Sequence, residues 1–232
     1  MCFFHSQLQF KDPNKIISFK KVYALKTCSP TMTPTLLLAT NNPHKVEEFR
    51  SILLPYDVTL QTPADLGLFN DVIEDGNTYF ENALLKAQVY WQDGQNQVLA
   101  DDSGLEVDAL QGAPGIHSHR FLPDLKATSH DRCLYLLERL QDIPRPWRAA
   151  FHCEVVLLTR QGLFLKSHGI CTGQIIPEFR GENGFGYDPI FLVDGTDHTM
   201  AELEPAKKNQ LSHRGKAVSG IIKQLEFPLR QV

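Results

Sequence analysis

The sequence lacks the patterns that identify several large protein classes. Its five cysteines form no Cys-x-x-Cys pair, and neither an HExxH motif nor a GxxxxGKS/T phosphate-binding loop occurs. These absences exclude the common zinc motifs and the P-loop nucleotide hydrolases. The chain also has no apolar run long enough to cross a bilayer as a helix. Because the cysteines are scattered and odd in number, we expect reduced thiols and a cytoplasmic protein.

Positive charge is scarce beyond the N-terminal segment. Residues 1–34 carry five lysines, no arginine and one acid; subtracting these from 23 basic and 27 acidic residues leaves 18 and 26 for the rest, a net charge of −8. So acidic a body is a poor surface for nucleic acid, whose phosphates need a basic face. A small polyphosphate can still bind where a few lysines and a divalent cation reverse the local field.

The N-terminal segment shows no helical or strand periodicity. Its apolar residues are too interrupted for a signal peptide, and a segment without arginine is a poor organelle-targeting sequence. We therefore expect a poorly ordered extension over residues 1–34 and one domain over residues 35–232.

The remaining sequence alternates between strand and helix patterns. Apolar or alternating runs predict strands at residues 35–39, 98–100, 105–109, 149–159, 163–175 and 189–193. Apolar residues at helical spacing predict helices over 43–54, 78–91 and 128–140 and a last helix from about residue 212. This order favours an α/β fold with a mixed sheet.

Two adjacent carboxylates, Asp101 and Asp102, follow the apolar strand at 98–100. We expect Ser103-Gly104 to turn the chain and to release both side chains at the carboxyl end of this strand, where open α/β sheets bind ligands. With Glu74 they offer only oxygen atoms, which favours Mg²⁺ over Zn²⁺. A solvated turn is the alternative interpretation of this pair.

Two lysines accompany these carboxylates. Lys45 lies in the first turn of a helix that Asn42 caps, beside exposed backbone N–H groups that suit an anion. Lys86 lies one turn after Asn82, on a flank of the apolar stripe of the second helix, from where it can reach a pocket. Taken alone, Lys45 could equally be solvated, and for Lys86 a solvated position is the better interpretation.

The C-terminal part contains a glycine-rich loop and a basic turn. The loop over residues 181–189 lets the backbone approach a ligand, and Phe185 offers a face on which a base can stack. Lys208 precedes the turn Ser212-His213-Arg214-Gly215, whose His and Arg side chains can donate hydrogen bonds to a base carbonyl. His117-Ser-His119 we interpret as structural or solvated.

Seven motifs occur in the order of one known family. They are Thr40-Asn-Asn-x-x-Lys45, Glu74 before Glu81-Asn-Ala-x-x-Lys86, Ala100-Asp-Asp-Ser-Gly-Leu105, Gly112-Ala-Pro-Gly115, Phe151-His-Cys153, Gly184-Phe-Gly-Tyr-Asp-Pro189 and Ser212-His-Arg-Gly215. From Thr35 onward the chain resembles the inosine/xanthosine triphosphate pyrophosphatases, which remove non-standard purine nucleotides. The family's usual Thr-Gly-Asn turn is Thr-Asn-Asn here, and asparagine also tolerates a left-handed φ.

The resemblance implies a two-lobed α/β fold around a mixed, twisted sheet with a cleft between the lobes, and a homodimer. It also implies Mg²⁺-dependent hydrolysis of ITP, dITP and XTP to the monophosphate and pyrophosphate. By motif, Asp102 would be the proton acceptor and, with Glu74, a metal ligand. Residues for the phosphates would be Thr40, Asn41, Asn42, Pro43, His44, Lys45, Lys86 and Ser103, and those for base and sugar Phe185, Gly186, Tyr187, Asp188, Lys208, His213 and Arg214.

Two other functions stay open from the residues. A related pyrophosphatase could act on dTTP, UTP or modified pyrimidines. A nucleotide-binding sensor without turnover is the third possibility, although a sensor has no need of a water-activating carboxylate such as Asp102.

Overall fold

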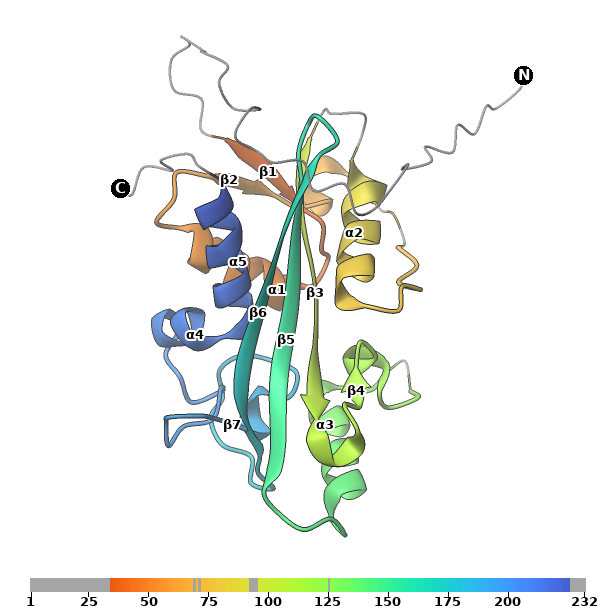
Figure 1. The fold of residues 1–232 in the computed structure, drawn as a ribbon, viewed down its shortest axis with the longest axis vertical. Coiled ribbons are helices and arrows are strands. Elements are labelled where there is room, and N and C mark those ends of the chain that lie inside the picture. The colour runs from red at the N-terminus through yellow and green to blue at the C-terminus, as the bar shows by residue number, and fades with distance from the viewer. Residues whose placement is uncertain (1–33, 69, 71, 92–95, 125, 226–232) are drawn as a thin grey trace, which may run out of the picture. The chain divides into compact units, whose positions relative to one another are not determined.

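The computed structural model describes residues 34–68, 70, 72–91, 96–124 and 126–225 (Figure 1). The predicted extension over residues 1–34 lies, apart from Pro34, outside these residues. Within the described part, no helix combines the length and the apolar character that a membrane span needs.

A mixed sheet forms the centre of the described domain. Its strand order is β2-β1-β3-β5-β6-β7, and the short β4 pairs with β3. The strands are β1 (Thr35–Leu38), β2 (Thr59–Gln61), β3 (Gln97–Val107), β4 (Pro114–Gly115), β5 (Trp147–Leu158), β6 (Phe164–Ile175) and β7 (Phe191–Val193). Only the β1–β2 and β1–β3 pairs are parallel. The α/β fold with a mixed sheet is therefore confirmed.

Helices cover both faces of this sheet. They are α1 (Pro43–Leu53), α2 (Tyr79–Tyr90), α3 (Ser129–Leu140), α4 (Pro205–Leu211) and α5 (His213–Gln224). The cap of α1 is as predicted, because the Asn42 side chain accepts hydrogen bonds from the N–H groups of His44 and Lys45. The sequence analysis missed α4, whose seven residues are too few to show a periodic apolar stripe.

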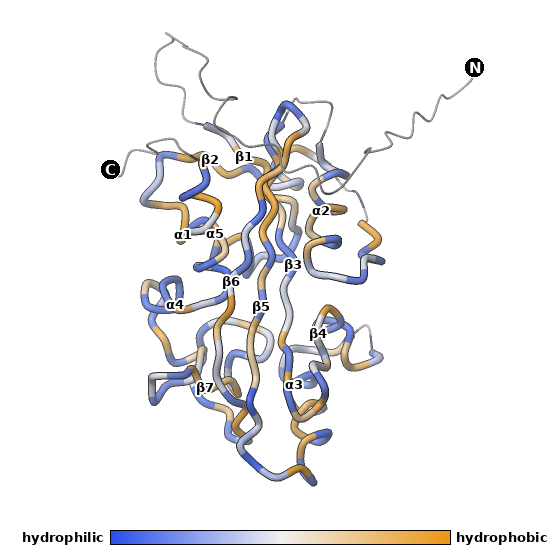
Figure 2. The backbone as a smooth tube through the Cα atoms, in the orientation of Figure 1, coloured by the Kyte–Doolittle hydropathy of each residue, from blue (hydrophilic) through white to orange (hydrophobic). Residues whose placement is uncertain are grey.

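Two hydrophobic cores lie toward opposite ends of the long strands. One packs α2 against β1, β3 and β5 and contains Ala83, Val98 and Val156. The other packs α3 against β3, β5 and β7 and contains Leu105 and Leu136. Between them the middle of β3 is hydrophilic, as Figure 2 shows. These two cores correspond to the two lobes that the resemblance implied.

The expected turn at Ser103-Gly104 is wrong. β3 is continuous from Gln97 to Val107, so the strand predicted at 98–100 and most of the one predicted at 105–109 are a single strand. The predicted end at residue 109 is wrong, because Asp108–Leu110 form a short 3-10 helix. The physical reason is β5, which pairs with every residue from Val98 to Val107, Ser103 and Gly104 included. A serine and a glycine that would turn a free chain stay extended when a long neighbour supplies their hydrogen bonds.

One edge of β3 nevertheless opens in the middle. Its parallel pairing with β1 ends at Leu99, and β4 takes over that edge only at Leu105. Within the described residues, the stretch between these points has no strand neighbour on this side. Side chains from both faces of β3 therefore border the same open edge, next to the carboxyl end of β1.

Helix α5 reaches the sheet through a glycine of β6. A Cβ atom added to Gly169 would lie 2.0 Å from the carbonyl oxygen of His213 and 2.6 Å from the amide nitrogen of Ala217. The start of α5, with His213 and Arg214, can therefore sit at its present depth only while residue 169 has no side chain.

We predict that Gly169→Ala displaces the start of α5. Overpacking of this kind costs about 1–3 kcal/mol, and urea unfolding should show a loss of that size. Ile170→Thr is the matched control, because Ile170 is 39% exposed on the opposite face of the same strand and should change stability by less than about 0.5 kcal/mol. Equal stability of Gly169→Ala and the wild type would contradict this account of α5.

Candidate functional site

A cavity of about 760 Å³ lies along the open edge of β3. It is lined by every residue that the sequence analysis assigned to catalysis, metal or substrate: Thr40, Asn41, Asn42, Pro43, His44, Lys45, Glu74, Lys86, Asp102, Ser103, Phe185, Gly186, Tyr187, Asp188, Lys208, His213 and Arg214. The structure thus brings together residues from one end of the domain sequence to the other. Their individual roles stay predictions.

Asp102 and Glu74 meet at Lys86. The Lys86 ammonium nitrogen lies 3.2 Å from a carboxylate oxygen of each acid, and the Asn82 amide donates a further hydrogen bond of 3.2 Å to Asp102. Burial by itself would lower the pKa of Lys86, but Asp102 and the other nearby carboxylates outweigh it and raise that pKa. Lys86 therefore stays charged, and it is a cavity residue rather than a solvated lysine.

Asp101 faces the other side of the sheet, as alternation along a continuous strand requires. The sequence analysis counted it among the possible Mg²⁺ ligands because it expected a turn; this is wrong, since Asp101 does not line the cavity. Its carboxylate lies 3.0 Å from the Lys45 ammonium and 3.2 Å from the Arg214 guanidinium. Burial would raise the pKa of Asp101, but these two cations hold it well below its usual range.

A second charged cluster forms where α1, α4 and the glycine-rich loop meet. Lys208 lies 2.6 Å from the Glu48 carboxylate and 2.7 Å from that of Asp188. Gly184 packs directly on this pair: its φ is +82°, and a Cβ there would lie 2.1 Å from Asp188 Oδ2 and 2.7 Å from Lys208 Nζ. The absence of a side chain at Gly184 therefore leaves room for the Asp188–Lys208 ion pair in the cavity wall, in addition to any space that it leaves for a ligand.

Arg214 joins this cluster to Asp101. Its guanidinium donates to Glu48, to Asp101 and, over 3.0 Å, to the Ser103 hydroxyl. The Arg214 side chain is fully buried and each of its three guanidinium nitrogens already donates a hydrogen bond. These bonds hold the start of α5 against β3 and α1. This leaves few of its donors for a base carbonyl, the role that the resemblance implied.

His213 differs from its neighbour because it has a free ring nitrogen. Burial, followed by the charges of Arg214 and Lys208, lowers the pKa of His213 well below its usual value, so the imidazole is neutral. Its ring stacks on Phe151 with centroids 4.8 Å apart, and among the described residues its Nδ1 has no hydrogen-bond partner. A buried polar atom of this kind in a cavity wall is suited to a ligand.

Phe185 carries a stacked ring. The His44 imidazole lies nearly parallel to it, with centroids 5.3 Å apart and planes 12° apart. The cations of Lys208 and Arg214 lie 5.5 and 5.7 Å from the Phe185 centroid. The aromatic face that the sequence predicted for a base therefore borders the same cluster as His213.

Several cavity residues escaped the sequence analysis. Glu48 gave no signal because a glutamate on a helix flank is usually solvated, and Arg120 and Arg132 stand in no motif. His119, which the sequence analysis treated as structural or solvated, also borders the cavity. The Thr40-Asn-Asn turn needs no glycine, because neither of its asparagines has a positive φ. In the described part of the chain, Gln111 is the one non-glycine residue that does.

The donor set near Lys86 fits a magnesium ion only if the substrate completes it. Among the described residues, no three His, Cys, Asp or Glu side chains form a metal cluster. Glu74 and Asp102 already converge on one cation, the Lys86 ammonium. Mg²⁺ is commonly held by one or two carboxylates together with substrate phosphates and water, and two carboxylates meet that requirement.

Fold and cavity together define an α/β protein whose cleft suits a small polyanion attached to an aromatic group. A family model, the Ham1 family, matches residues 36–224. A dITP/XTP pyrophosphatase from Vibrio parahaemolyticus is 42% identical over 199 residues, 84% of this chain and 98% of the relative. The chain belongs to the Ham1 family, which confirms the resemblance seen in its motifs.

Solved structures agree with this assignment. A HAM1 protein from Coxiella burnetii aligns with a TM-score of 0.74 at 36% identity, covering 83% of this chain and 98% of that one. The Ham1 protein from Staphylococcus aureus has a TM-score of 0.72 at 37% identity, with the same two coverages. A second relative, the dITP/XTP pyrophosphatase from Desulforamulus reducens, is 43% identical over 184 residues, 79% of this chain and 91% of the relative.

We predict that Asp101→Asn destabilises the protein by about 3–5 kcal/mol at neutral pH, because it leaves Lys45 without a carboxylate and Arg214 with Glu48 alone. A carboxylate with a lowered pKa stabilises the fold above the unfolded-state pKa, and this contribution is lost as the pH falls through the folded-state pKa. The difference from the wild type should therefore shrink once the pH falls below the ordinary aspartate value of 3.8.

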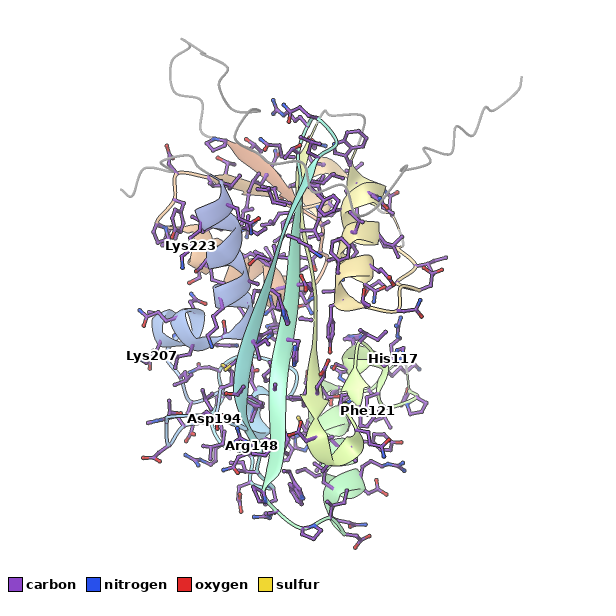
Figure 3. All side chains as sticks on the ribbon, in the orientation of Figure 1. His117, Phe121, Arg148, Asp194, Lys207 and Lys223 are labelled. Atoms are coloured by element: carbon purple, nitrogen blue, oxygen red, sulfur yellow. The ribbon has the colours of Figure 1, made fainter. Side chains whose placement is uncertain are left out.

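Urea unfolding at neutral pH and at about pH 2 measures both parts of this prediction. Asp194→Asn is the control, because Asp194 forms an exposed ion pair with Arg148 (Figure 3) that should contribute no more than about 1 kcal/mol. A loss for Asp101→Asn as small as the control's would show that the buried pair contributes little.

Proposed function

We propose that this protein is a Mg²⁺-dependent pyrophosphatase that converts ITP, dITP and XTP to the monophosphate and pyrophosphate. The observation that carries the proposal is one cavity in which the Glu74 and Asp102 carboxylates converge, while neutral His213 and Phe185 line the same wall. Family membership and the printed activity of the relatives, dITP/XTP pyrophosphatase, support it.

In this proposal Asp102 is the general base. A water attacks the α-phosphorus, its oxygen forms the new P–O bond, and the bond from the α-phosphorus to the bridging oxygen breaks. The proton of the water passes to Asp102, and pyrophosphate leaves. Glu74 and Asp102 would hold Mg²⁺, which supplies positive charge to stabilise the charge that develops on the phosphates.

The lysines and hydroxyls bind the phosphates. Lys45 at the start of α1 and Lys86 on α2 border the cavity from two sides, and the Thr40–Lys45 segment adds polar side chains to the cavity wall. The N–H groups of His44 and Lys45 are already bonded to the Asn42 side chain, so the charge of Lys45 is the main contribution of this helix start. Ser103 offers a hydroxyl from the open edge of β3. Because Lys86 already contacts both acids, it compensates one of their two negative charges before a metal or a substrate arrives.

Purine selection rests on the group at C6. Hypoxanthine and xanthine carry an oxygen there, whereas adenine carries an amine. Donors aimed at that oxygen, from Lys208 or from a tautomer of His213 protonated at Nδ1, would face another donor in ATP. Each unsatisfied buried donor costs about 1–3 kcal/mol, so two such mismatches exclude ATP effectively. Phe185–Asp188 and Arg214 complete this base and sugar pocket.

We also propose three properties beyond the site. The catalytic domain spans residues 35–232 and the segment 1–34 is an extension, which the match of the family model to residues 36–224 supports. The protein acts in the cytoplasm, because its substrates belong to the intracellular nucleotide pool. It acts as a homodimer, an expectation taken from the family resemblance that sedimentation of the full chain tests.

We predict that the full chain releases pyrophosphate from dITP, ITP and XTP, at least about a hundredfold more efficiently than from ATP, and only with a divalent ion present. A panel of nucleotides with and without Mg²⁺, followed by detection of pyrophosphate, measures this. Preference for dTTP or UTP would indicate a pyrimidine enzyme instead. Binding without any pyrophosphate release would indicate a sensor.

We predict that Asp102→Asn lowers kcat by about a hundredfold or more, because an amide cannot accept the proton of the attacking water. Asp108→Asn is the matched control: Asp108 follows the same strand, is exposed, and should leave kcat unchanged. Near-normal turnover of dITP by Asp102→Asn would remove Asp102 from the mechanism.

A further inference from the structure

The charges around the cavity are compensated unevenly. On the base side, Lys208 is paired with Glu48 and Asp188, and Arg214 with Glu48 and Asp101. At the centre, Lys86 is paired with Glu74 and Asp102, and Lys45 with Asp101. Each of these four cations therefore has a carboxylate within ion-pair distance.

Two other cations of the cavity wall have none. Arg120 and Arg132 both line the cavity, and within the described part of the chain neither lies within ion-pair distance of a carboxylate. Arg120 donates to the backbone carbonyl of Glu74 over 3.4 Å. Arg132 donates to the carbonyl of Ala127 over 2.8 Å and to the Ser129 hydroxyl over 3.2 Å.

These contacts hold the two guanidinium groups without neutralising them. A carbonyl and a hydroxyl orient a guanidinium but bring no negative charge, and each arginine keeps further N–H donors beyond the ones so used. Arg132 is anchored at the first turn of α3, where Ser129 also accepts a hydrogen bond of 3.2 Å from the backbone N–H of Gly186. The position of Arg132 relative to the glycine-rich loop is therefore fixed.

His119 borders the cavity together with the two arginines. Burial, followed by Arg132 and Lys45 and to a smaller extent Arg120, lowers its pKa, while Glu74 opposes this. The imidazole therefore lies in the field of both arginines as well as of Lys45 and Glu74. Arg120 also contacts the backbone of Glu74, so part of the surplus positive charge lies next to a proposed metal ligand.

We propose that Arg120 and Arg132 form an anion subsite that binds the pyrophosphate part of the substrate, its β- and γ-phosphates, and then the released pyrophosphate. This inference rests on the proposed function, because it names the part of that substrate which the subsite takes. Guanidinium groups bind phosphate oxygens through two parallel hydrogen bonds, and they do so most strongly where no carboxylate competes. A nucleoside diphosphate, one phosphate shorter, should use the subsite less well.

Calorimetric titration of the full chain with inorganic pyrophosphate tests the subsite directly. We expect the double variant Arg120→Gln/Arg132→Gln to bind pyrophosphate at least about tenfold more weakly than the wild type, since hydrogen bonds to charged groups are lost at both positions. The control Arg139→Gln changes an exposed arginine on α3 that lies outside the cavity lining, and it should bind as the wild type does.

A second ligand separates binding from a structural role. Deoxyinosine monophosphate has no pyrophosphate part, so its affinity should stay within about twofold in the double variant. Equal losses for the monophosphate and for pyrophosphate would overturn the proposal, because the arginines would then support the cavity rather than bind this anion. Unchanged pyrophosphate affinity would overturn it as well.

The subsite and the proposed function fail in different ways. If the wild type released no pyrophosphate from dITP, the function would be wrong. If it turned over dITP and the double variant bound pyrophosphate as the wild type does, only the subsite would be wrong. Should the double variant unfold, each single variant is titrated instead, and about threefold to tenfold weaker binding is expected of each.

Discussion

The loss of a strand neighbour halfway along β3 determines where this protein places its charged groups. β5 keeps β3 extended on one side, while on the other side β1 ends at Leu99 and β4 begins to pair only at Leu105. Asp101 and Asp102 therefore point to opposite faces of a continuous strand, yet both lie beside an open edge. Asp101 forms buried ion pairs with Lys45 and Arg214, whereas Asp102 borders the cavity.

The buried charged side chains of this domain are held in ion pairs. Glu48 comes from α1, Asp101 from β3, Lys208 from α4 and Arg214 from α5, and their ion pairs connect all four elements. Ion pairs of this kind contribute little net stability, because desolvation offsets much of their attraction, but removal of one member leaves a buried charge without a partner. The network therefore fixes how these elements meet, and with that the shape of the pocket proposed for the base.

The sequence predicted the elements better than their ends. Strong local signals, such as Asn42 as the cap of α1 and the apolar or alternating runs at 149–159 and 163–175, predicted a helix and two strands correctly. Ser103-Gly104 misled because a turn preference is local, whereas pairing with β5 is not. Every site residue that the sequence analysis proposed lines one cavity, but Glu48 and Arg132 belong to no motif; only the tertiary fold shows that they face it.

The uneven compensation of charge suits a protein whose net charge is −4. Its acidic surface repels large polyanions such as nucleic acid, so an anion must be small enough to enter the cavity before it meets surplus positive charge. On the side of the cavity proposed for the base, Lys208 and Arg214 are already paired with carboxylates, so their charge alone does not attract an anion. What this side offers a ligand is directed hydrogen-bond donors and the aromatic face of Phe185. Under the proposed assignment of these residues, a ligand has to satisfy both halves: a polyphosphate without the right base lacks the directed hydrogen bonds, and a base without phosphates does not reach the surplus charge.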